Sequence, residues 1–82
     1  MSKQLKKWNY QKKEYEEYSV PDSWNVGVYA FDMDTCVDCA HCGTPKPYGL
    51  TFTSMEIHTE AGIGYAVCDK CYEEEMGRRY GK

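Results

Sequence analysis

The chain has 82 residues, of which 41% are hydrophobic and 28% charged, and its formal net charge is −3. This composition is typical of a globular protein. The length allows one domain, with a core so thin that a metal, disulfides or a partner chain often has to stabilise it. No apolar run approaches the roughly 20 residues of a membrane span, and the first residues lack the apolar stretch of a secretory signal. An odd number of cysteines, five, also argues against a secreted disulfide scaffold, so we expect a cytoplasmic protein without a membrane partner.

Charge is unevenly distributed along the chain. Residues 1–13 carry five lysines and no acid, residues 14–38 carry seven acids and no base, and the remainder is nearly balanced. We therefore expect a basic, aromatic N-terminal arm, residues 1–24, partly packed on a cysteine-bearing domain, residues 25–82. The arm is predicted to begin with a short helix, because no Gly or Pro precedes Pro21, although its apolar period is poor.

Three β-prone segments follow the arm. Residues 26–31 form the first, with Gly27 as its weak point. Residues 50–58 form the best strand, and a change of apolar face along it predicts a bulge near residues 53–54 or a strand buried on both faces. Residues 59–62 should form a hairpin loop in which Gly62 takes a positive φ, and residues 63–67 should form the returning strand.

Residues 72–80 are predicted to form a short C-terminal helix. Its glutamates lie in the first turn and its arginines in the last, as the helix dipole favours, and Tyr72, Met76 and Tyr80 share one face. The core is predicted to contain five aromatic residues, namely Trp24, Tyr29, Phe31, Phe52 and Tyr65.

The strongest signal is a pair of Cys-x-x-Cys motifs, formed by Cys39 with Cys42 and by Cys68 with Cys71. Two intervening residues let both sulfurs of a pair face one ion, and two such pairs are typical of structural zinc sites. Gly43 follows the first pair, where a left-handed residue can close the turn. We predict one structural Zn²⁺ bound by these four cysteines, in a zinc-binding domain spanning residues 25–82 whose folding depends on the metal.

Other ligands and another metal are alternatives at this stage. Cys36 stands at the same spacing from Cys39 as Cys42 does, but the glycine after Cys42 favours Cys39 and Cys42, which leaves Cys36 as a small buried side chain. His41 and His58 are expected to be structural or exposed rather than ligands. Four thiolates also bind iron, so a rubredoxin-like electron-transfer site is an alternative, although a helix rather than a second Cys-Gly turn is expected after the second pair.

The order of elements from residue 36 to residue 80 resembles that of treble-clef and zinc-ribbon domains. In those domains a Cys-x-x-Cys turn, or knuckle, precedes a β-hairpin, and a second knuckle opens a helix. Residues 53–59 and 64–68 are also similar to segments of small zinc proteins encoded by bacteriophages. The resemblance implies a small α+β zinc-stabilised, treble-clef-like domain with an aromatic-rich N-terminal extension, and a regulatory protein that acts in the cytoplasm of a host cell.

The remaining signals point to binding rather than catalysis. Tyrosine and tryptophan are favoured interface anchors, and the candidate partner-binding residues are Trp8, Tyr10, Tyr15 and Tyr18. We expect a protein-interaction module that regulates or inhibits another protein, with an oligomeric state and a partner that the sequence does not identify. Nucleic-acid binding is the alternative, with the arm lysines on phosphates, but the net charge is negative. No Ser/His/Asp set and no phosphate loop is present, so we expect no enzyme.

Overall fold

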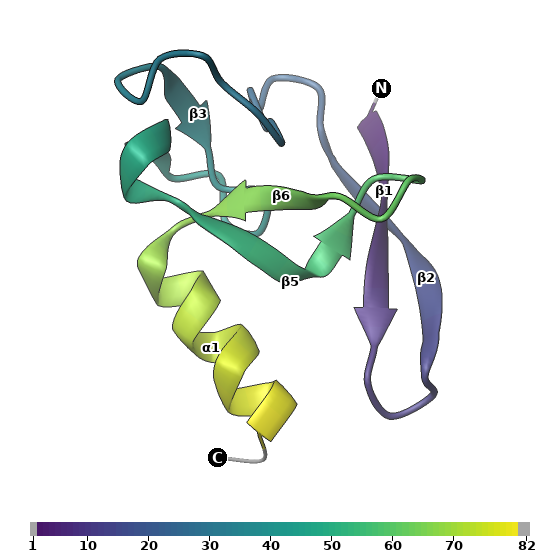
Figure 1. Ribbon diagram of the computed structural model, residues 1–82. Helices are drawn as coiled ribbons and strands as arrows, with labels where there is room; N and C mark the ends of the chain where they lie inside the picture. The colour runs from purple at the N-terminus through teal and green to yellow at the C-terminus, as the bar shows by residue number, and fades with distance from the viewer. Residues whose placement is uncertain (1, 81–82) are drawn as a thin grey trace.

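Two antiparallel sheets and a C-terminal helix make up the fold in the computed structural model, which describes residues 2–80 (Figure 1). The strands are β1 (Ser2–Asn9), β2 (Glu14–Pro21), β3 (Cys36–Asp38), β4 (Pro45–Pro47), β5 (Phe52–His58) and β6 (Gly64–Val67). A 3-10 helix, η1 (Tyr48–Leu50), precedes β5, and α1 (Asp69–Tyr80) follows β6. The larger sheet has the order β2-β1-β5-β6, and β3 pairs with β4 in the smaller one. The predicted small α+β class is confirmed.

The N-terminal residues form a β-hairpin, so the predicted N-terminal helix is wrong. β1 pairs with β2 from Ser2 opposite Pro21 to Asn9 opposite Glu14. Asn9 closes the turn, because its side-chain oxygen accepts hydrogen bonds from the N–H groups of Gln11 and Lys12 at 2.9 and 3.0 Å. An Asx turn of this kind reverses the chain direction without Gly or Pro. The absence of those two residues before Pro21 therefore does not indicate a helix.

The basic and acidic blocks of the sequence are cross-strand partners in this hairpin. Lys6 lies opposite Glu17, and Lys7 lies opposite Glu16. Opposite charges facing each other across an antiparallel pair stabilise it modestly. The reversal of charge sign near residue 13 is therefore the sequence signal for a hairpin.

The hairpin belongs to the same sheet and core as the cysteine-bearing half of the chain. β1 pairs with β5, with Lys7 opposite Ile57. Leu5 and Val20 are buried in one cluster with Ile57 and with three of the five cysteines. That residues 1–24 form an arm partly packed on a zinc-binding domain of residues 25–82 stays a prediction.

The predicted β5–β6 hairpin is confirmed, including its bulge. The pairing register of the two strands shifts between Thr53 and His58, and Gly62 in the loop has φ +88°. At Gly64 the two strands approach so closely that an added Cβ would collide with the backbone oxygen of Ser54. The strand predicted over residues 26–31 is wrong, because this segment touches β6 through one backbone bond, from the Ala66 N–H to the Gly27 oxygen (2.9 Å), and forms no ladder.

Short aliphatic and cysteine side chains fill the core, and this corrects the aromatic core predicted from the sequence. Trp24 and Tyr65 pack against the core cluster as expected. Tyr29, Phe31 and Phe52 are instead exposed, at 63%, 96% and 44% of their surface. The cysteine cluster lies within the core, so it occupies space that aromatic side chains fill in a larger domain.

The helix is confirmed, but it begins earlier than predicted. α1 starts at Asp69, before the predicted residue 72, and its buried residues are Cys71 and Glu75. Of the three residues that share a face, Tyr72 packs against the core cluster, whereas Met76 and Tyr80 are exposed. Cys71 has to face the cysteine cluster, and residues four positions apart share a helix face, so Glu75 is carried inward. In the described part of the chain, no helix is long and apolar enough to cross a membrane.

Candidate metal centre

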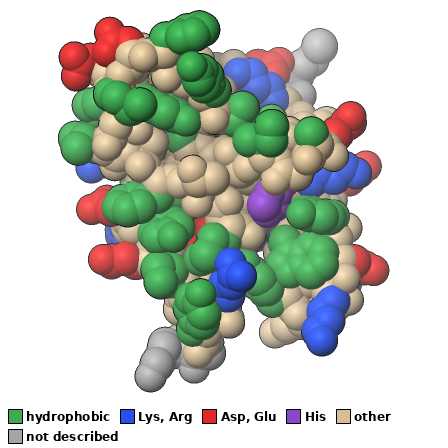
Figure 2. Space-filling view, in the orientation of Figure 1, with side chains coloured by type: hydrophobic (Ala, Val, Ile, Leu, Met, Phe, Trp, Pro, Cys, Tyr) green, Lys and Arg blue, Asp and Glu red, His purple; other side chains and the backbone are tan. Residues whose placement is uncertain are grey.

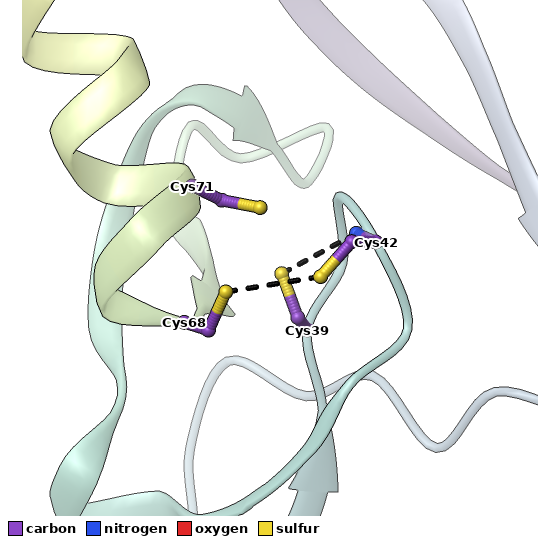
Figure 3. A group of neighbouring side chains, drawn as sticks. All are labelled: Cys39, Cys42, Cys68 and Cys71. Atoms are coloured by element: carbon purple, nitrogen blue, oxygen red, sulfur yellow. Dashed lines mark hydrogen bonds between the residues drawn. The ribbon is translucent and has the colours of Figure 1, made fainter.

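The four cysteines of the two motifs converge on one point between β3, β6 and α1 (Figure 3). Their Sγ atoms all lie within 4.8 Å of one another, and those of Cys42 and Cys68 are 3.7 Å apart. A zinc ion with Zn–S bonds of about 2.3 Å places tetrahedral ligands about 3.8 Å from each other. Four clustered thiols at these separations fit one metal ion.

The first pair lies in a tight turn that follows β3. The Gly43 N–H donates to the Cys39 oxygen at 2.8 Å, and the N–H groups of His41 and Cys42 point at the Cys39 Sγ at 3.3 and 3.4 Å. These bonds offset the negative charge of a thiolate. Gly43 has φ +81°, as predicted, and a Cβ there would lie 2.6 Å from the Trp24 ring. Glycine is therefore required both by the backbone and by the packing of Trp24.

The second pair is held by the start of the helix. Cys68 is the residue between β6 and α1, and Cys71 lies in the first turn of α1. The Tyr72 N–H donates to the Cys68 oxygen at 2.9 Å. Cys39, Cys68 and Cys71 are buried, whereas Cys42 is exposed. Cys42 therefore forms the solvent side of the cluster.

The side chains left open as alternative ligands lie outside the cluster. The prediction that Cys36 is buried is wrong, because it is exposed in β3, where it stands opposite Pro47 of β4 at the edge of the domain's smaller sheet. The His41 ring turns to Arg78, with Nε2 3.5 Å from the guanidinium. Both ring nitrogens of His58 face carbonyl oxygens, those of Gly62 and Met55. Within residues 2–80, the group suited to a metal consists of Cys39, Cys42, Cys68 and Cys71.

No protein-family model, curated protein or solved structure matches this chain. The site and the surface around it therefore carry the functional argument.

The protein environment separates the thiols by their acidity. Burial raises the pKa of Cys39, and burial together with hydrogen bonds to the neighbouring thiols raises the pKa of Cys71. Burial also acts to raise the pKa of Cys42, but hydrogen bonds with Thr44 and neighbouring cysteines outweigh it and lower this pKa to about 7. In the folded chain Cys42 therefore ionises more readily than Cys39 and Cys71, which hold their protons at neutral pH.

The affinity for metal is expected to rise with pH. The metal-free chain is expected to be unfolded, and thiols with an ordinary pKa of about 8.5 are protonated at neutral pH. Each of the four therefore has to release a proton when the metal binds, and the apparent affinity should increase at least about a thousandfold per pH unit near neutrality. A competition titration against a chromophoric chelator, corrected for the chelator's own protonation, measures this slope. An affinity that does not change between about pH 6.5 and pH 8.5 would contradict the proton release.

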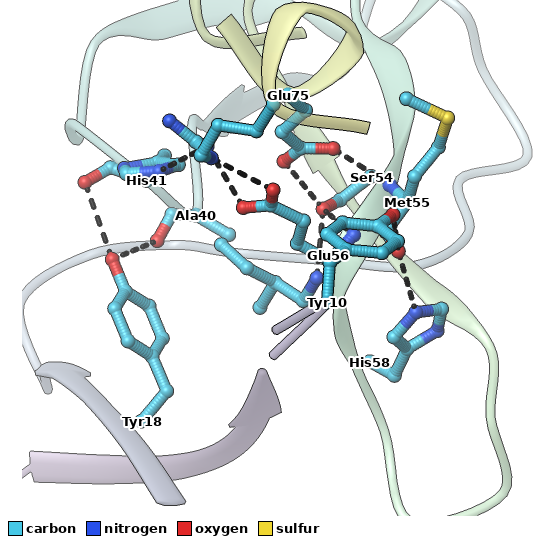
Figure 4. Close-up of polar contacts among 11 residues, drawn as sticks. Tyr10, Tyr18, Ala40, His41, Ser54, Met55, Glu56, His58 and Glu75 are labelled. Carbon is cyan, nitrogen blue, oxygen red and sulfur yellow. Dashed lines mark hydrogen bonds and ion pairs between the residues drawn. The ribbon is translucent and has the colours of Figure 1, made fainter. Parts of the chain in front are cut away.

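Two buried carboxylates beside the site were missed by the sequence analysis (Figure 4). Glu75 of α1 accepts a hydrogen bond from the Ser54 hydroxyl and another from the Met55 N–H, both at 2.7 Å. Ser54 in turn accepts from the N–H groups of Glu56 and Ile57 at 3.0 and 2.8 Å. Glu75 thus provides, from the helix, the hydrogen-bond acceptors that the bulge of β5 needs. Its position four residues after Cys71 places it on the same helix face, and this spacing is the sequence signal that would have indicated its burial.

The second carboxylate, Glu56, is paired with an arginine of the helix. Arg78 donates to both of its oxygens at 2.8 Å, a bidentate geometry that is stronger than a single contact. Glu56 and Glu75 have all four carboxylate oxygens engaged. This use of every oxygen identifies them as structural groups that join α1 to β5.

The predicted partner-binding aromatics lie on two different faces of the hairpin. Trp8 contacts the rings of Tyr10 and Tyr15, at centroid distances of 6.4 and 4.9 Å. Tyr18 is on the opposite face, where its hydroxyl donates to the Ala40 and His41 oxygens at 3.4 Å. Tyr18 therefore braces the cysteine turn, and the other three form one aromatic cluster.

Proposed function

We propose that this protein is a treble-clef-like domain stabilised by one structural zinc ion, and that it acts by binding another protein. Four thiolates leave a tetrahedral ion no open position for water or substrate, so the site is suited to stability rather than hydrolysis. The helix that contains Cys71 favours zinc over a rubredoxin-like iron site, in which a second Cys-Gly turn is expected.

The observation that carries the proposal is the large apolar surface left open beside the cysteine cluster. Met33, Leu50 and Phe52 are exposed, and Phe52 stacks on Tyr72 of α1 with ring centroids 4.8 Å apart. Figure 2 shows hydrophobic side chains gathered around β3 and η1 and continuing along α1. Contiguous apolar surface on a small domain is typical of a protein-binding site, and we call the set Met33, Leu50, Phe52, Tyr72 and Met76 the apolar face.

The nucleic-acid alternative receives less support from the contacts of the basic residues. Lys6 and Lys7 of β1 stand opposite glutamates of β2, Lys12 is 3.5 Å from Glu16, and Arg78 is paired with Glu56. Positive charges already neutralised within the protein release fewer counterions from a nucleic acid. The resemblance to phage zinc proteins extends the proposal to a small non-enzymatic regulator or inhibitor of a host enzyme, acting in the cytoplasm.

A capture experiment tests the proposal. The zinc-loaded protein is immobilised on a resin and incubated with a lysate of the cell in which it acts. It should retain one protein at moderate salt and after nuclease treatment. The double variant Leu50→Ser/Phe52→Ser should lose at least about tenfold of this retention, since each exchange removes an apolar anchor worth about 1 kcal/mol. The control Ile63→Ser, at an exposed position of the β5–β6 loop, should retain it. Retention that disappears with nuclease, or that both variants keep, would overturn the proposal.

A further inference from the structure

We propose that the outer edge of β2 binds an extended basic segment of a partner protein, which adds to the sheet as a fifth strand. This inference rests on the proposed function, because strand addition is one way of binding a protein. The outer edge of β2 is a second binding surface, separate from the apolar face, and its charge selects a basic segment.

The two edges of the large sheet are treated differently by the fold. At the β6 edge the Ala66 N–H donates to the Gly27 oxygen at 2.9 Å, and the Ala66 oxygen accepts from the Ala40 N–H at 3.0 Å. Neighbouring loops therefore cover this edge. β2 stands at the other end of the order β2-β1-β5-β6, and no strand of the described chain pairs with its outer side (Figure 1). Its outward N–H and C=O groups are open to another strand.

The charge of β2 determines which strand can pair there. Glu14, Glu16 and Glu17 are all exposed, and alternation along a strand places Glu14 and Glu16 on one face and Glu17 on the other. A basic segment arriving at the edge therefore meets carboxylates on both faces. A second copy of β2 would set glutamates against glutamates, and like charges across a strand pair are unfavourable.

β1 is an internal example of the proposed partner. It is a basic strand that already pairs with the inner edge of β2, with Lys6 opposite Glu17 and Lys7 opposite Glu16. At the outer edge Glu14 and Glu17 offer carboxylates to a strand on the other side, whereas Glu16 already accepts from Asn9 and Lys12. Tyr15 adds an apolar contact, because it is 46% exposed and shares its face with Glu17, so an aliphatic side chain of the incoming strand has a ring to pack on.

The test uses a capped eight-residue peptide made of two Lys-Lys-Val-Val repeats, which matches the eight residues of β2 and places lysines on both of its faces. Added to the zinc-loaded protein, it should bind and slow the hydrogen exchange of alternate amides in β2. The same peptide N-methylated at every residue keeps its charge but donates no backbone hydrogen bond, and it should bind at least about tenfold more weakly. Glutamates replacing the lysines should abolish binding.

Matched protein variants distinguish binding at the β2 edge from non-specific electrostatic attraction between a basic peptide and an acidic protein. Glu14→Gln/Glu17→Gln should weaken binding about fivefold, and Glu73→Gln/Glu74→Gln, the same change of charge on exposed positions of α1, should leave it unchanged. Equal binding of the methylated peptide, equal loss in both variants, exchange unaltered in β2, or self-association through β2 in place of peptide binding would each overturn the inference. The capture experiment uses no β2 variant and the peptide experiment no apolar-face variant, so either proposal can fail without the other.

Discussion

Removing the metal will unfold the protein. Four thiolates contribute apparent binding free energies of about 10–16 kcal/mol to zinc-stabilised domains, which is at least as large as the roughly 5–15 kcal/mol that stabilises a whole domain. Here the cluster also lies in the core, in which Cys39, Cys68 and Cys71 are buried. We expect one zinc ion per chain by elemental analysis, and loss of near-ultraviolet circular dichroism and of amide shift dispersion when a strong chelator is added.

Two cysteine variants provide the matched comparison. Cys68→Ser removes one of the clustered thiols and should lower zinc content and abolish the folded spectrum. Cys36→Ser makes the same exchange at an exposed position outside the cluster and should leave both unchanged. A chelated protein that keeps its dispersed spectrum would show that the fold does not need the metal, and one equivalent of iron would revive the electron-transfer alternative.

The cysteine cluster and the elements next to it could be predicted because their signals are local. Spacing within each motif requires a tight turn, and the glycines at positions 43 and 62 have the positive φ values that their turns require. The bulge of β5 was visible as a change of apolar face between Phe52 and Met55. Signals of this kind depend on a few neighbouring residues, so no knowledge of the tertiary structure is needed to read them.

The hairpin and the core could not be predicted in the same way, because both depend on what lies across the sheet. β1 looks like a basic tail until Lys6 and Lys7 are placed opposite Glu17 and Glu16. The rings of Tyr29 and Phe31 look like core residues until the cysteine cluster is seen to occupy the centre. A search for charge reversal around a turn-forming asparagine such as Asn9 would have indicated the hairpin.

Replacing Glu75 by alanine will cost far more stability than replacing an exposed glutamate of α1. The change removes the acceptor of two 2.7 Å bonds and leaves the Ser54 O–H and the Met55 N–H without an acceptor. Hydrogen bonds to charged groups are worth about 1.5–3 kcal/mol each, and the release of a desolvated carboxylate offsets part of that. We expect the free energy of unfolding to fall by about 3 kcal/mol, measured by urea denaturation of the zinc-loaded protein.

The neighbouring residue provides the control for this prediction. Glu74→Ala makes the same exchange at an exposed position of the same helix and should change stability by less than about 0.5 kcal/mol. Glu75→Gln should lie between the two, because the amide oxygen can accept one of the two bonds while its NH₂ group faces a donor. Equal stability of the two alanine variants would mean that Glu75 does not join the helix to β5.

A double-mutant cycle with Ser54 then separates the hydrogen bond from the cavity that each exchange leaves. Ser54 links Glu75 to the N–H groups of Glu56 and Ile57, so once either partner is gone the loss of the other should cost less. We expect Ser54→Ala/Glu75→Ala to be more stable than the sum of the single variants by about 1 kcal/mol. Additive losses would mean that the two side chains act independently, and that packing rather than the polar network holds α1 against the bulge.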